Sequence, residues 1–296
     1  MLQPTLEAPG SVLRKLMAQG IVVMPGVFNA ISAVSAQKAG AEALYLSGAG
    51  ITNASLGVPD IALATLSEFA QQAAYVTQVV PVPVLCDADT GFGEALNVAR
   101  TVIEMERAGL AGIHLEDQVS PKRCGHLDGK TCIEPEEMAR KIRAAVDSKR
   151  DASFMIVART DARGVEGLES AIERAIQYEA IGADAVFPEG LTSESEFEAF
   201  RKALNIPLLA NMTEFGKTPI IPVSRFRDLG YQMVIFPMTA FRVMPKALDS
   251  TYTELLATGT QAGLIDSMRT RLELYDRIDY AEYDAKDQGW SGGLST

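Results

Sequence analysis

Residues 82–117, VPVLCDADTGFGEALNVARTVIEMERAGLAGIHLED, contain two continuous apolar runs with a helical segment between them. The first run, 82–86, ends in Asp87, and the second, 112–115, ends in Glu116. Continuous apolar runs are typical of strands covered on both faces. A helix between two such strands predicts that they pair in parallel. The stretch therefore predicts one strand–helix–strand unit of a parallel α/β protein.

The same alternation recurs along the chain and predicts the fold class. We expect strands at 21–24, 43–46, 82–86, 112–115, 154–158, 185–187, 207–210 and 233–236. We expect helices at 11–19, 30–38, 66–78, 95–108, 135–148, 167–180, 193–203, 223–229, 240–258 and 261–275. Eight such units predict a (β/α)8 TIM barrel. A doubly wound open sheet is the alternative, although no Gly-x-Gly-x-x-Gly follows the first strand to indicate a dinucleotide site. We expect a single barrel domain over residues 1–296, with a C-terminal helical extension whose polar part after Tyr275 is partly disordered.

Composition excludes several classes of function. A formal net charge of -11 argues against a nucleic-acid surface, which needs a basic stripe. The three cysteines, Cys86, Cys124 and Cys132, form no CxxC pair and are odd in number, which favours a reducing compartment. No signal-peptide pattern is present, and no apolar run reaches the roughly 18 residues that a membrane span needs. We expect a cytoplasmic protein that binds neither nucleic acid nor membrane.

Polar residues follow most of the predicted strands. In a barrel the C-terminal strand ends share one face, which is where active sites lie. Asp87, Asp89 and Glu116 stand at two neighbouring ends, and without a cation they would repel one another. Mg²⁺ takes oxygen ligands of this kind. An Asp-x-Asp pair alone is also typical of a turn or helix cap, but the acidic neighbour favours a metal site.

Two arginines follow strands at the same face. Arg159 and Arg242 are natural forks for substrate carboxylates, and the alternative is that they pair with Asp161 or Glu189. Tyr45 and His114 lie within predicted apolar strands. We interpret both as core residues whose hydrogen bonds are satisfied.

The segment Lys122-Arg123-Cys124-Gly125-His126 places a thiol among cations and an imidazole. Such neighbours favour the thiolate and ease proton exchange at sulfur. Because Gly125 permits a sharp bend and turn residues flank the segment, we expect 118–130 to be a mobile loop. A thiol there suits proton transfer to an anionic substrate. The alternative is a solvated basic loop with an incidental cysteine.

Taken together, these motifs resemble the isocitrate lyase and phosphoenolpyruvate mutase superfamily. The resemblance is carried by residues 87–93 (DADTGFG), 113–118 (IHLEDQ), 122–126 (KRCGH), 158–161 (ARTD), 187–189 (FPE), 211–216 (NMTEFG) and 270–271 (TR). The chain departs from the pattern at Ala49, where relatives usually carry a second glycine after Ser47-Gly48.

The resemblance implies an activity and an assembly. It implies cleavage of the tricarboxylate (2S,3R)-2-methylisocitrate to pyruvate and succinate, in propionate breakdown through the 2-methylcitrate cycle. It also implies Mg²⁺ or Mn²⁺, a homotetramer, and exchange of the last barrel helix between paired subunits.

The resemblance also implies roles for particular residues. The metal site comprises Asp87, Asp89, Glu116 and Asp60. Cys124 is the acid, His126 stands beside it, and Tyr45, ionised by nearby cations, is the candidate general base. The substrate site comprises Ser47, Gly48, Ala49, Gly125, Arg159, Glu189, Asn211, Met212, Thr213, Arg242 and Arg271. Phe187, Ile235 and Pro237 form a small apolar pocket for the methyl group on C2.

Other activities of the superfamily stay open from the sequence. They include cleavage of isocitrate or 2,3-dimethylmalate, and decarboxylation or hydrolysis of oxo acids. Cys124 argues against the last group, and the absence of large insertions argues against isocitrate as the main substrate. A different class is a non-catalytic barrel that senses a metabolite, against which the intact acidic residues and Cys124 speak.

Overall fold

A computed structural model describes residues 7–126 and 129–291 of the chain. Its eight parallel strands are β1 (Val22–Val27), β2 (Leu44–Leu46), β3 (Val84–Asp87), β4 (Gly112–Glu116), β5 (Met155–Thr160), β6 (Ala185–Pro188), β7 (Leu209–Asn211) and β8 (Met233–Phe236). The strands follow the order β6-β5-β4-β3-β2-β1-β8-β7. A parallel bridge between Val186 and Leu208 joins the two ends of this sheet. The predicted (β/α)8 barrel is confirmed.

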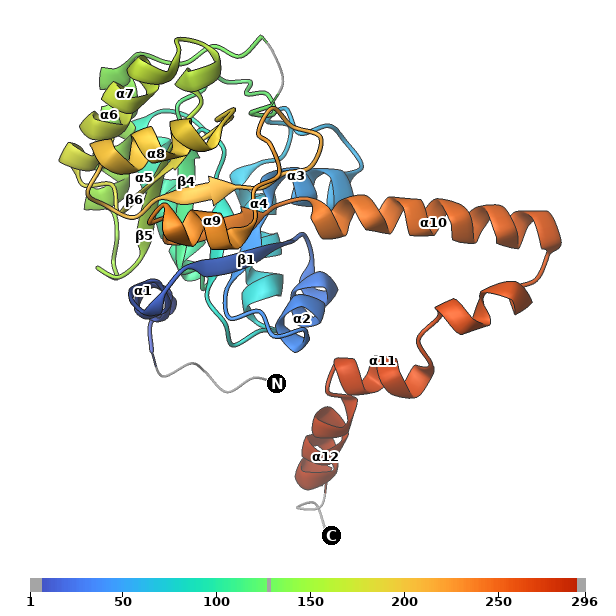
Figure 1. Ribbon diagram of the computed structural model, residues 1–296. Coiled ribbons are helices and arrows are strands. Elements are labelled where there is room, and N and C mark those ends of the chain that lie inside the picture. Colours follow the sequence, from blue (N-terminus) through green and yellow to red (C-terminus); the bar gives the residue numbers. More distant parts are fainter. Residues whose placement is uncertain (1–6, 127–128, 292–296) are drawn as a thin grey trace.

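Helices cover the outside of the barrel, as Figure 1 shows. Those of the barrel are α1 (Pro9–Gln19), α2 (Ala30–Lys38), α3 (Gly48–Ile51), α4 (Leu66–Thr77), α5 (Ala95–Arg107), α6 (Pro135–Asp147), α7 (Leu168–Ile181), α8 (Glu194–Ala203) and α9 (Val223–Asp228). A π-helical turn, η1 (Thr52–Leu56), follows α3, and a 3-10 turn, η2 (Ala162–Gly164), follows β5. The sequence did not predict α3 and η1, because helices of four or five residues are too short to show an apolar period.

The hydrophobic core has an inner and an outer part. Side chains such as Met24, Leu85 and Ile235 fill the barrel interior. Larger clusters pack between the sheet and its surrounding helices, and Phe69 and Phe197 are fully buried there. This double covering explains why the strands read as continuous apolar runs.

The C-terminal arm, residues 239–291, departs from the predicted form. Its first helix, α10 (Thr239–Thr258), has no buried residue and projects away from the barrel (Figure 1). The predicted helix 261–275 is wrong: a 3-10 turn, η3 (Ala262–Ser267), comes first, and α11 (Arg271–Arg277) starts afresh. Thr270 explains the restart, because its hydroxyl and Glu273 form a capping box. The expected disorder after Tyr275 is also wrong over 280–291, which form the helix α12 (Tyr280–Ser291).

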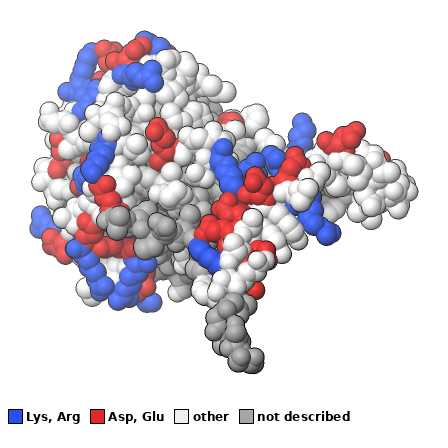
Figure 2. Space-filling model, turned by 90° about the horizontal axis from the view of Figure 1, so that it is seen from below, with Lys and Arg blue, Asp and Glu red and all other residues white. Residues whose placement is uncertain are grey.

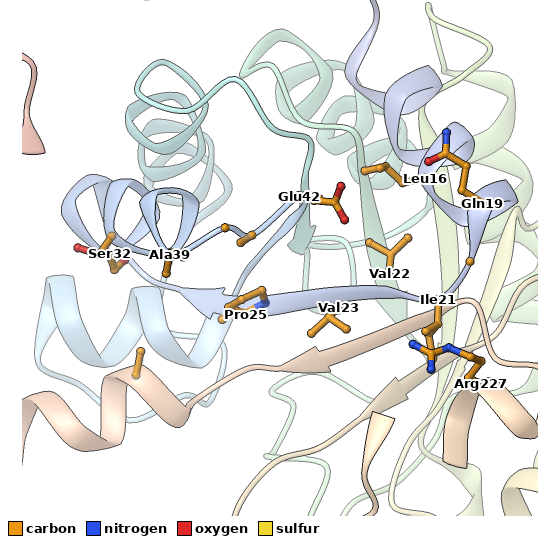
Figure 3. A pocket seen from close by; sticks show the side chains of 17 residues that line it. Leu16, Gln19, Ile21, Val22, Val23, Pro25, Ser32, Ala39, Glu42 and Arg227 are labelled. Atoms are coloured by element: carbon orange, nitrogen blue, oxygen red, sulfur yellow. The ribbon is translucent and has the colours of Figure 1, made fainter. Parts of the chain in front are cut away.

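A groove of about 840 Å³ lies outside β1, between α1 and α2, and Figure 3 shows its lining. Val23, on the outer face of β1, is 39% exposed, whereas the described residues of β2 to β7 are all buried. An eighth barrel helix normally packs against such a strand. In this chain α10 leaves instead, so the outer face of β1 is uncovered.

Charge is mixed over the surface. Figure 2 shows acidic and basic side chains interspersed on the visible face and along the arm. Within 7–126 and 129–291, no helix is both long and apolar enough to cross a membrane.

Candidate active site

A cavity of about 190 Å³ opens at the C-terminal ends of the strands. Of the predicted site residues, those lining it are Tyr45, Ser47, Ala49, Asp60, Asp87, Cys124, Gly125, His126, Arg159, Phe187, Glu189, Asn211, Thr213, Ile235, Pro237 and Arg242. The barrel topology therefore gathers residues that are far apart in the sequence, as the prediction from strand ends requires.

An acidic cluster forms one wall of this cavity and contains a lysine. Nζ of Lys122 lies 2.6 Å from Oδ1 of Asp60 and 2.8 Å from Oδ1 of Asp89. Asp87 accepts a hydrogen bond of 3.0 Å from the backbone N–H of Asp89. The expected repulsion among the carboxylates is thus relieved by a buried ammonium group. Lys122 belongs to the site, although the sequence assigned it only to the neighbourhood of the thiol.

The pKa values of these carboxylates shift in different directions. Burial opposes ionisation of Asp87, but His114, Lys122 and Arg159 outweigh it and lower its pKa. Burial raises the pKa of Asp89 to about 7, with Asp87 adding to the rise and Lys122 opposing it. Burial likewise raises the pKa of Glu116 well above its ordinary value, against the attraction of Arg159. The cluster therefore holds fewer negative charges than its composition suggests.

The donor set fits a hard divalent cation only in part. Asp87 and Asp89 supply two carboxylates close together, and both side-chain oxygens of Glu116 are buried without a hydrogen bond. Mg²⁺ is commonly held by one or two carboxylates plus waters and substrate, which these residues can provide. In the described part of the chain, no three His, Cys, Asp or Glu side chains already converge as a preformed cage. Lys122 holds Asp60 and also contacts Asp89, so Asp87 and Glu116 are the carboxylates of the set that it does not pair with.

Arg159 occupies the centre of a buried ion-pair network. It is 8% exposed, and its Nε lies 2.9 Å from Asp161. Other guanidinium nitrogens lie 3.3 Å from Glu116 and 3.6 Å from Glu189. The alternative reading, in which Arg159 pairs with Asp161 and Glu189, is confirmed. Because Arg159 also lines the cavity, the network leaves it facing any anion bound there.

Arg242, on the first turn of α10, also lines the cavity. Its guanidinium lies 3.1 Å from Oε2 of Glu214 and over the ring of Phe215, 5.3 Å from the ring centroid. Neither of the partners expected from the sequence, Asp161 and Glu189, is among its ion pairs. A loop after β7 thus positions this second fork.

The loop after β4 is tied down at several points. The amide side chain of Gln118 donates to the backbone oxygen of Arg123 at 2.8 Å and accepts from its N–H at 2.9 Å. Nε2 of His126 lies 2.8 Å from Glu189, and Nδ1 accepts from the backbone N–H of Lys217 at 3.0 Å. Cys124 lies between these anchors, exposed and facing the cavity.

Gly125 serves a close approach rather than the expected sharp bend. Its φ is not positive, whereas that of Gly129 is 80°. A Cβ atom at position 125 would lie 2.5 Å from a guanidinium nitrogen of Arg159. Residues 127 and 128 of the predicted loop 118–130 lie outside the described residues.

Tyr45 is not the ionised base that the sequence suggested. Its hydroxyl group lies 2.8 Å from Nε2 of His114, which in turn lies 3.5 Å from Asp87. Burial, and then Asp87, raise the pKa of Tyr45 well above its ordinary value, so the phenol keeps its proton. Burial lowers the pKa of His114 to about 4, so its ring is neutral. Both residues are buried, as interpreted, and the Tyr45 hydroxyl group has its partner, but Nδ1 of His114 is buried without a hydrogen bond, so the expectation of a fully satisfied histidine is wrong.

Some predicted residues do not line the cavity. Gly48 lies against its wall, because a Cβ there would be 2.6 Å from Oδ2 of Asp87. Asp89 and Glu116 lie deeper, within the network described above. Met212 packs in the outer core beside Ile221, and Arg271 stands exposed at the start of α11 on the arm.

Sequence reasoning also missed residues that line the cavity. They are Asn53, Lys122, Arg123 and Met238. Met238 follows β8 directly and accepts a hydrogen bond of 3.4 Å from Ser47, so its place after a strand could have identified it. Asn53 lies in η1, a turn that no pattern in the sequence predicts.

A parallel barrel with buried carboxylates, two arginines and a loop thiol at one mouth defines an α/β-barrel enzyme site for an anionic substrate. Residues 13–256 match the family model described as phosphoenolpyruvate phosphomutase. The chain belongs to this family, which confirms the predicted superfamily.

Similar relatives extend this result to nearly the whole chain. The chain is 57% identical to the 2-methylisocitrate lyase of Aeropyrum pernix over 95% of its length and 91% of that protein. It is 46% identical to the 2-methylisocitrate lyase of Escherichia coli, over 95% of its own length and 96% of the relative. A solved structure of 2,3-dimethylmalate lyase superposes with a TM-score of 0.92 at 33% identity, covering 98% of each chain.

Proposed function

We propose that the protein is a 2-methylisocitrate lyase that cleaves a carbon–carbon bond of (2S,3R)-2-methylisocitrate to give pyruvate and succinate. The observation that carries the proposal is the cavity in which Asp87, Cys124 and Arg159 meet, within a chain 57% identical to a protein of that name. The lower identity to 2,3-dimethylmalate lyase, 33%, disfavours that substrate as the main one.

Substrate binding follows from the charges around the cavity. The substrate carries three carboxylates, and Arg159 and Arg242, from β5 and α10, both line the cavity as planar, always charged donors. The buried partners of Arg159 fix its orientation before substrate arrives. Asn211, which donates to Glu189 at 3.0 Å, leaves its buried side-chain oxygen without a partner, so it can accept from a substrate hydroxyl group.

As the carbon–carbon bond breaks, the C2 hydroxyl group loses its proton to a base in the cavity and becomes the ketone of pyruvate. The bond electrons remain on a carbanion next to a carboxylate, and this charge must be stabilised and then protonated. Arg159 stabilises it electrostatically in a water-poor setting. Cys124, on the loop and facing the cavity, donates its proton to that carbon. The loop contacts of Gln118 and His126 hold the thiol near the reacting atoms.

Asp87 and Asp89, supported by Glu116, would hold Mg²⁺ or Mn²⁺. When bound, such an ion lowers the pKa of the substrate hydroxyl group and stabilises the developing carbonyl oxygen. The ammonium group of Lys122 contacts both Asp60 and Asp89, so its positive charge offsets theirs on the loop side of the site.

A small apolar wall of the cavity can accommodate the methyl group on C2 of the substrate. Phe187 is fully buried, Ile235 is 1% exposed, and both line the cavity together with Pro237. The ring of Phe187 is fixed from two sides, by the edge of His114 at 5.3 Å and the guanidinium of Arg159 at 5.1 Å. A methyl group on C2 would replace water against this wall.

A direct assay tests the function. Purified protein with Mg²⁺ is given 2-methylisocitrate, isocitrate or 2,3-dimethylmalate, and pyruvate, glyoxylate and succinate are quantified. We expect pyruvate and succinate from the first substrate at the highest kcat/KM. Preferential turnover of another substrate, or of none, would contradict the proposal.

The assembly we propose is a homotetramer in which paired subunits exchange the C-terminal arm. The uncovered groove at Val23 supports it, as do the exposed apolar residues of α10, among them Tyr252 and Leu256 at 56% and 85% exposure. Arg271, which stands on the arm, would then act at a second copy's site. Mass measurement in solution tests this: Val23→Asp, which charges the groove, should yield smaller species than wild type. A wild-type monomer would contradict the exchange.

The domain organisation and compartment remain parts of the same proposal. We propose one barrel domain over residues 1–296 with the arm as its extension. The three free cysteines, which form no disulfide in the structure, support a reducing, cytoplasmic setting. Fractionation of the native cells tests the compartment.

A further inference from the structure

Lys130 is a buried lysine that the site described above does not use. Its side chain is 3% exposed, and Nζ lies 2.8 Å from Oδ1 of Asp161. The same ammonium group donates to the backbone oxygen of Gly125, the residue directly after Cys124. Lys130 therefore connects the thiol-bearing loop to the end of β5.

The anchor at the other end of this connection is rigid. Asp161 is fully buried, and its backbone N–H donates to Asp117 at 2.8 Å. Its carboxylate also accepts from Arg159, at 2.9 Å to Nε and 3.2 Å to a terminal nitrogen. One carboxylate thus holds both the lysine that contacts the loop and the arginine that faces the cavity.

The loop segment that Lys130 contacts lies directly on the site. A Cβ at Gly125 would approach both Arg159 and Glu189 too closely, so the backbone there packs against these two side chains. Displacement of the Gly125 carbonyl group would carry Cys124 with it, because the two residues are adjacent. A contact at this carbonyl group therefore controls where the thiol lies relative to Arg159.

We propose that Lys130 is a positioning residue that fastens the Cys124 loop over Arg159 by joining the Gly125 carbonyl group to Asp161. The catalytic part of this inference rests on the proposed function, since it takes Cys124 as the proton donor. The structural part, that Lys130 holds the Cys124 loop in place over Arg159, follows from the contacts alone. Gln118 and His126 also fasten the loop, but they do so through Arg123 and Glu189, whereas Lys130 binds Asp161, the carboxylate nearest to Arg159.

Hydrogen exchange by mass spectrometry tests the structural part without substrate. The reporter is a peptide covering 118–126, which includes the Arg123 amide hydrogen-bonded to Gln118. Because hydrogen bonds to charged groups shift equilibria by roughly 10- to 100-fold, Lys130→Met should speed exchange in this peptide by about that factor. Lys130→Arg, which keeps the charge and donors, should lie nearer to wild type.

A matched control separates loop fastening from loss of stability. Lys149 also pairs with an aspartate, the half-buried Asp184, at 3.0 Å, but at the opposite end of the barrel. Lys149→Met should leave the exchange of 118–126 unchanged. Peptides from β4 and β5 should exchange alike in all variants. Because Lys130→Met leaves Asp161 paired with Arg159 alone, Lys130→Met/Asp161→Asn provides the same readout with that carboxylate removed.

Kinetics test the catalytic part. In Lys130→Met we expect kcat to fall by about tenfold or more, because fewer bound complexes hold the thiol in place, with a smaller change in KM. Wild-type protein that does not cleave 2-methylisocitrate would contradict the proposed function and leave the exchange result standing. Folded Lys130→Met and double variants with wild-type exchange in 118–126 would overturn the role of Lys130.

Discussion

Nε2 of His126 lies 2.8 Å from Oε1 of Glu189, so the loop after β4 is joined to the end of β6. Nδ1 of His126 accepts a backbone hydrogen bond from Lys217, which leaves the ring proton on Nε2, facing the carboxylate. Glu189 is 1% exposed and also contacts Arg159 and Asn211. This glutamate therefore contributes to the stability of the site.

Glu189→Gln should lower stability in a pH-dependent way. Burial opposes ionisation of Glu189, but Arg159, His126 and Asn211 hold its pKa below the ordinary value of 4.5. A carboxylate with a depressed folded pKa contributes stability that is present above its unfolded pKa and is lost as pH falls through the folded value. Removing one buried partner costs about 3–5 kcal/mol.

Denaturant unfolding between pH 3 and pH 7 measures this effect. The difference between wild type and Glu189→Gln should be constant above roughly pH 5 and shrink at more acidic pH. A difference that grows as pH falls would show the opposite linkage. Glu169→Gln, on α7 and outside the site, serves as the control and should track wild type throughout.

Asp87→Ala should give a folded protein without measurable turnover. Asp87 lines the cavity, and its lowered pKa keeps it charged and ready to bind a cation. Exhaustive chelation of wild type should abolish activity in the same way, and Mg²⁺ should restore it. Calorimetry with Mg²⁺ should show weaker binding in Asp87→Ala than in Asp147→Ala, an exposed control on α6. Full turnover of chelated wild type would exclude a metal requirement.

Cys124→Ser should keep the fold yet lose about 10²- to 10⁴-fold in kcat, because a hydroxyl group is a far weaker acid than a thiol. Alkylation should inactivate wild type, and bound substrate should slow it, since Cys124 is exposed at the cavity mouth. Cys132→Ser is the matched control, because Cys132 is half-buried and lies outside the cavity. An active Cys124→Ser protein would remove the thiol from the mechanism.

The sequence predicted the barrel well because continuous apolar runs follow directly from burial on both faces. It predicted most of the cavity because strand ends in a barrel converge. It did not predict Lys122 in the acidic cluster, since the contacts with Asp60 and Asp89 depend on how the loop folds back. It placed Arg159 correctly but left its partners open, and only the register of β4 with β5 brings Glu116 beside it.

The arm shows a second limit. The apolar residues of α10 have the same character as those of a helix packed on its own barrel, so the sequence contains no signal for the direction in which α10 leaves. The start of a new helix after Thr270 could have been predicted from the sequence, because a threonine three residues before Glu273 is a capping-box pattern. The resemblance assigned Arg271 to the substrate site. In the structure Arg271 stands on the arm and does not line the cavity of its own chain.

Substrate choice should depend on the apolar wall at Phe187. One methyl-sized contact contributes about 1–3 kcal/mol, or roughly 10- to 200-fold in specificity, so wild type should prefer 2-methylisocitrate to isocitrate by that order. Phe187 is fully buried between His114 and Arg159, and a larger ring there must intrude on the cavity. Phe187→Trp should therefore reduce kcat/KM for 2-methylisocitrate more than for isocitrate.

Overpacking alone also has a cost, about 1–3 kcal/mol of stability, and the control must account for it. Phe200 is equally buried but lies in the outer core between the sheet and α8. Phe200→Trp should lower stability by a similar amount and leave the ratio of the two kcat/KM values unchanged. If Phe187→Trp also leaves that ratio unchanged, Phe187 does not contact the methyl group. If wild type cleaves isocitrate at least as efficiently as 2-methylisocitrate, the apolar wall does not select the substrate at all.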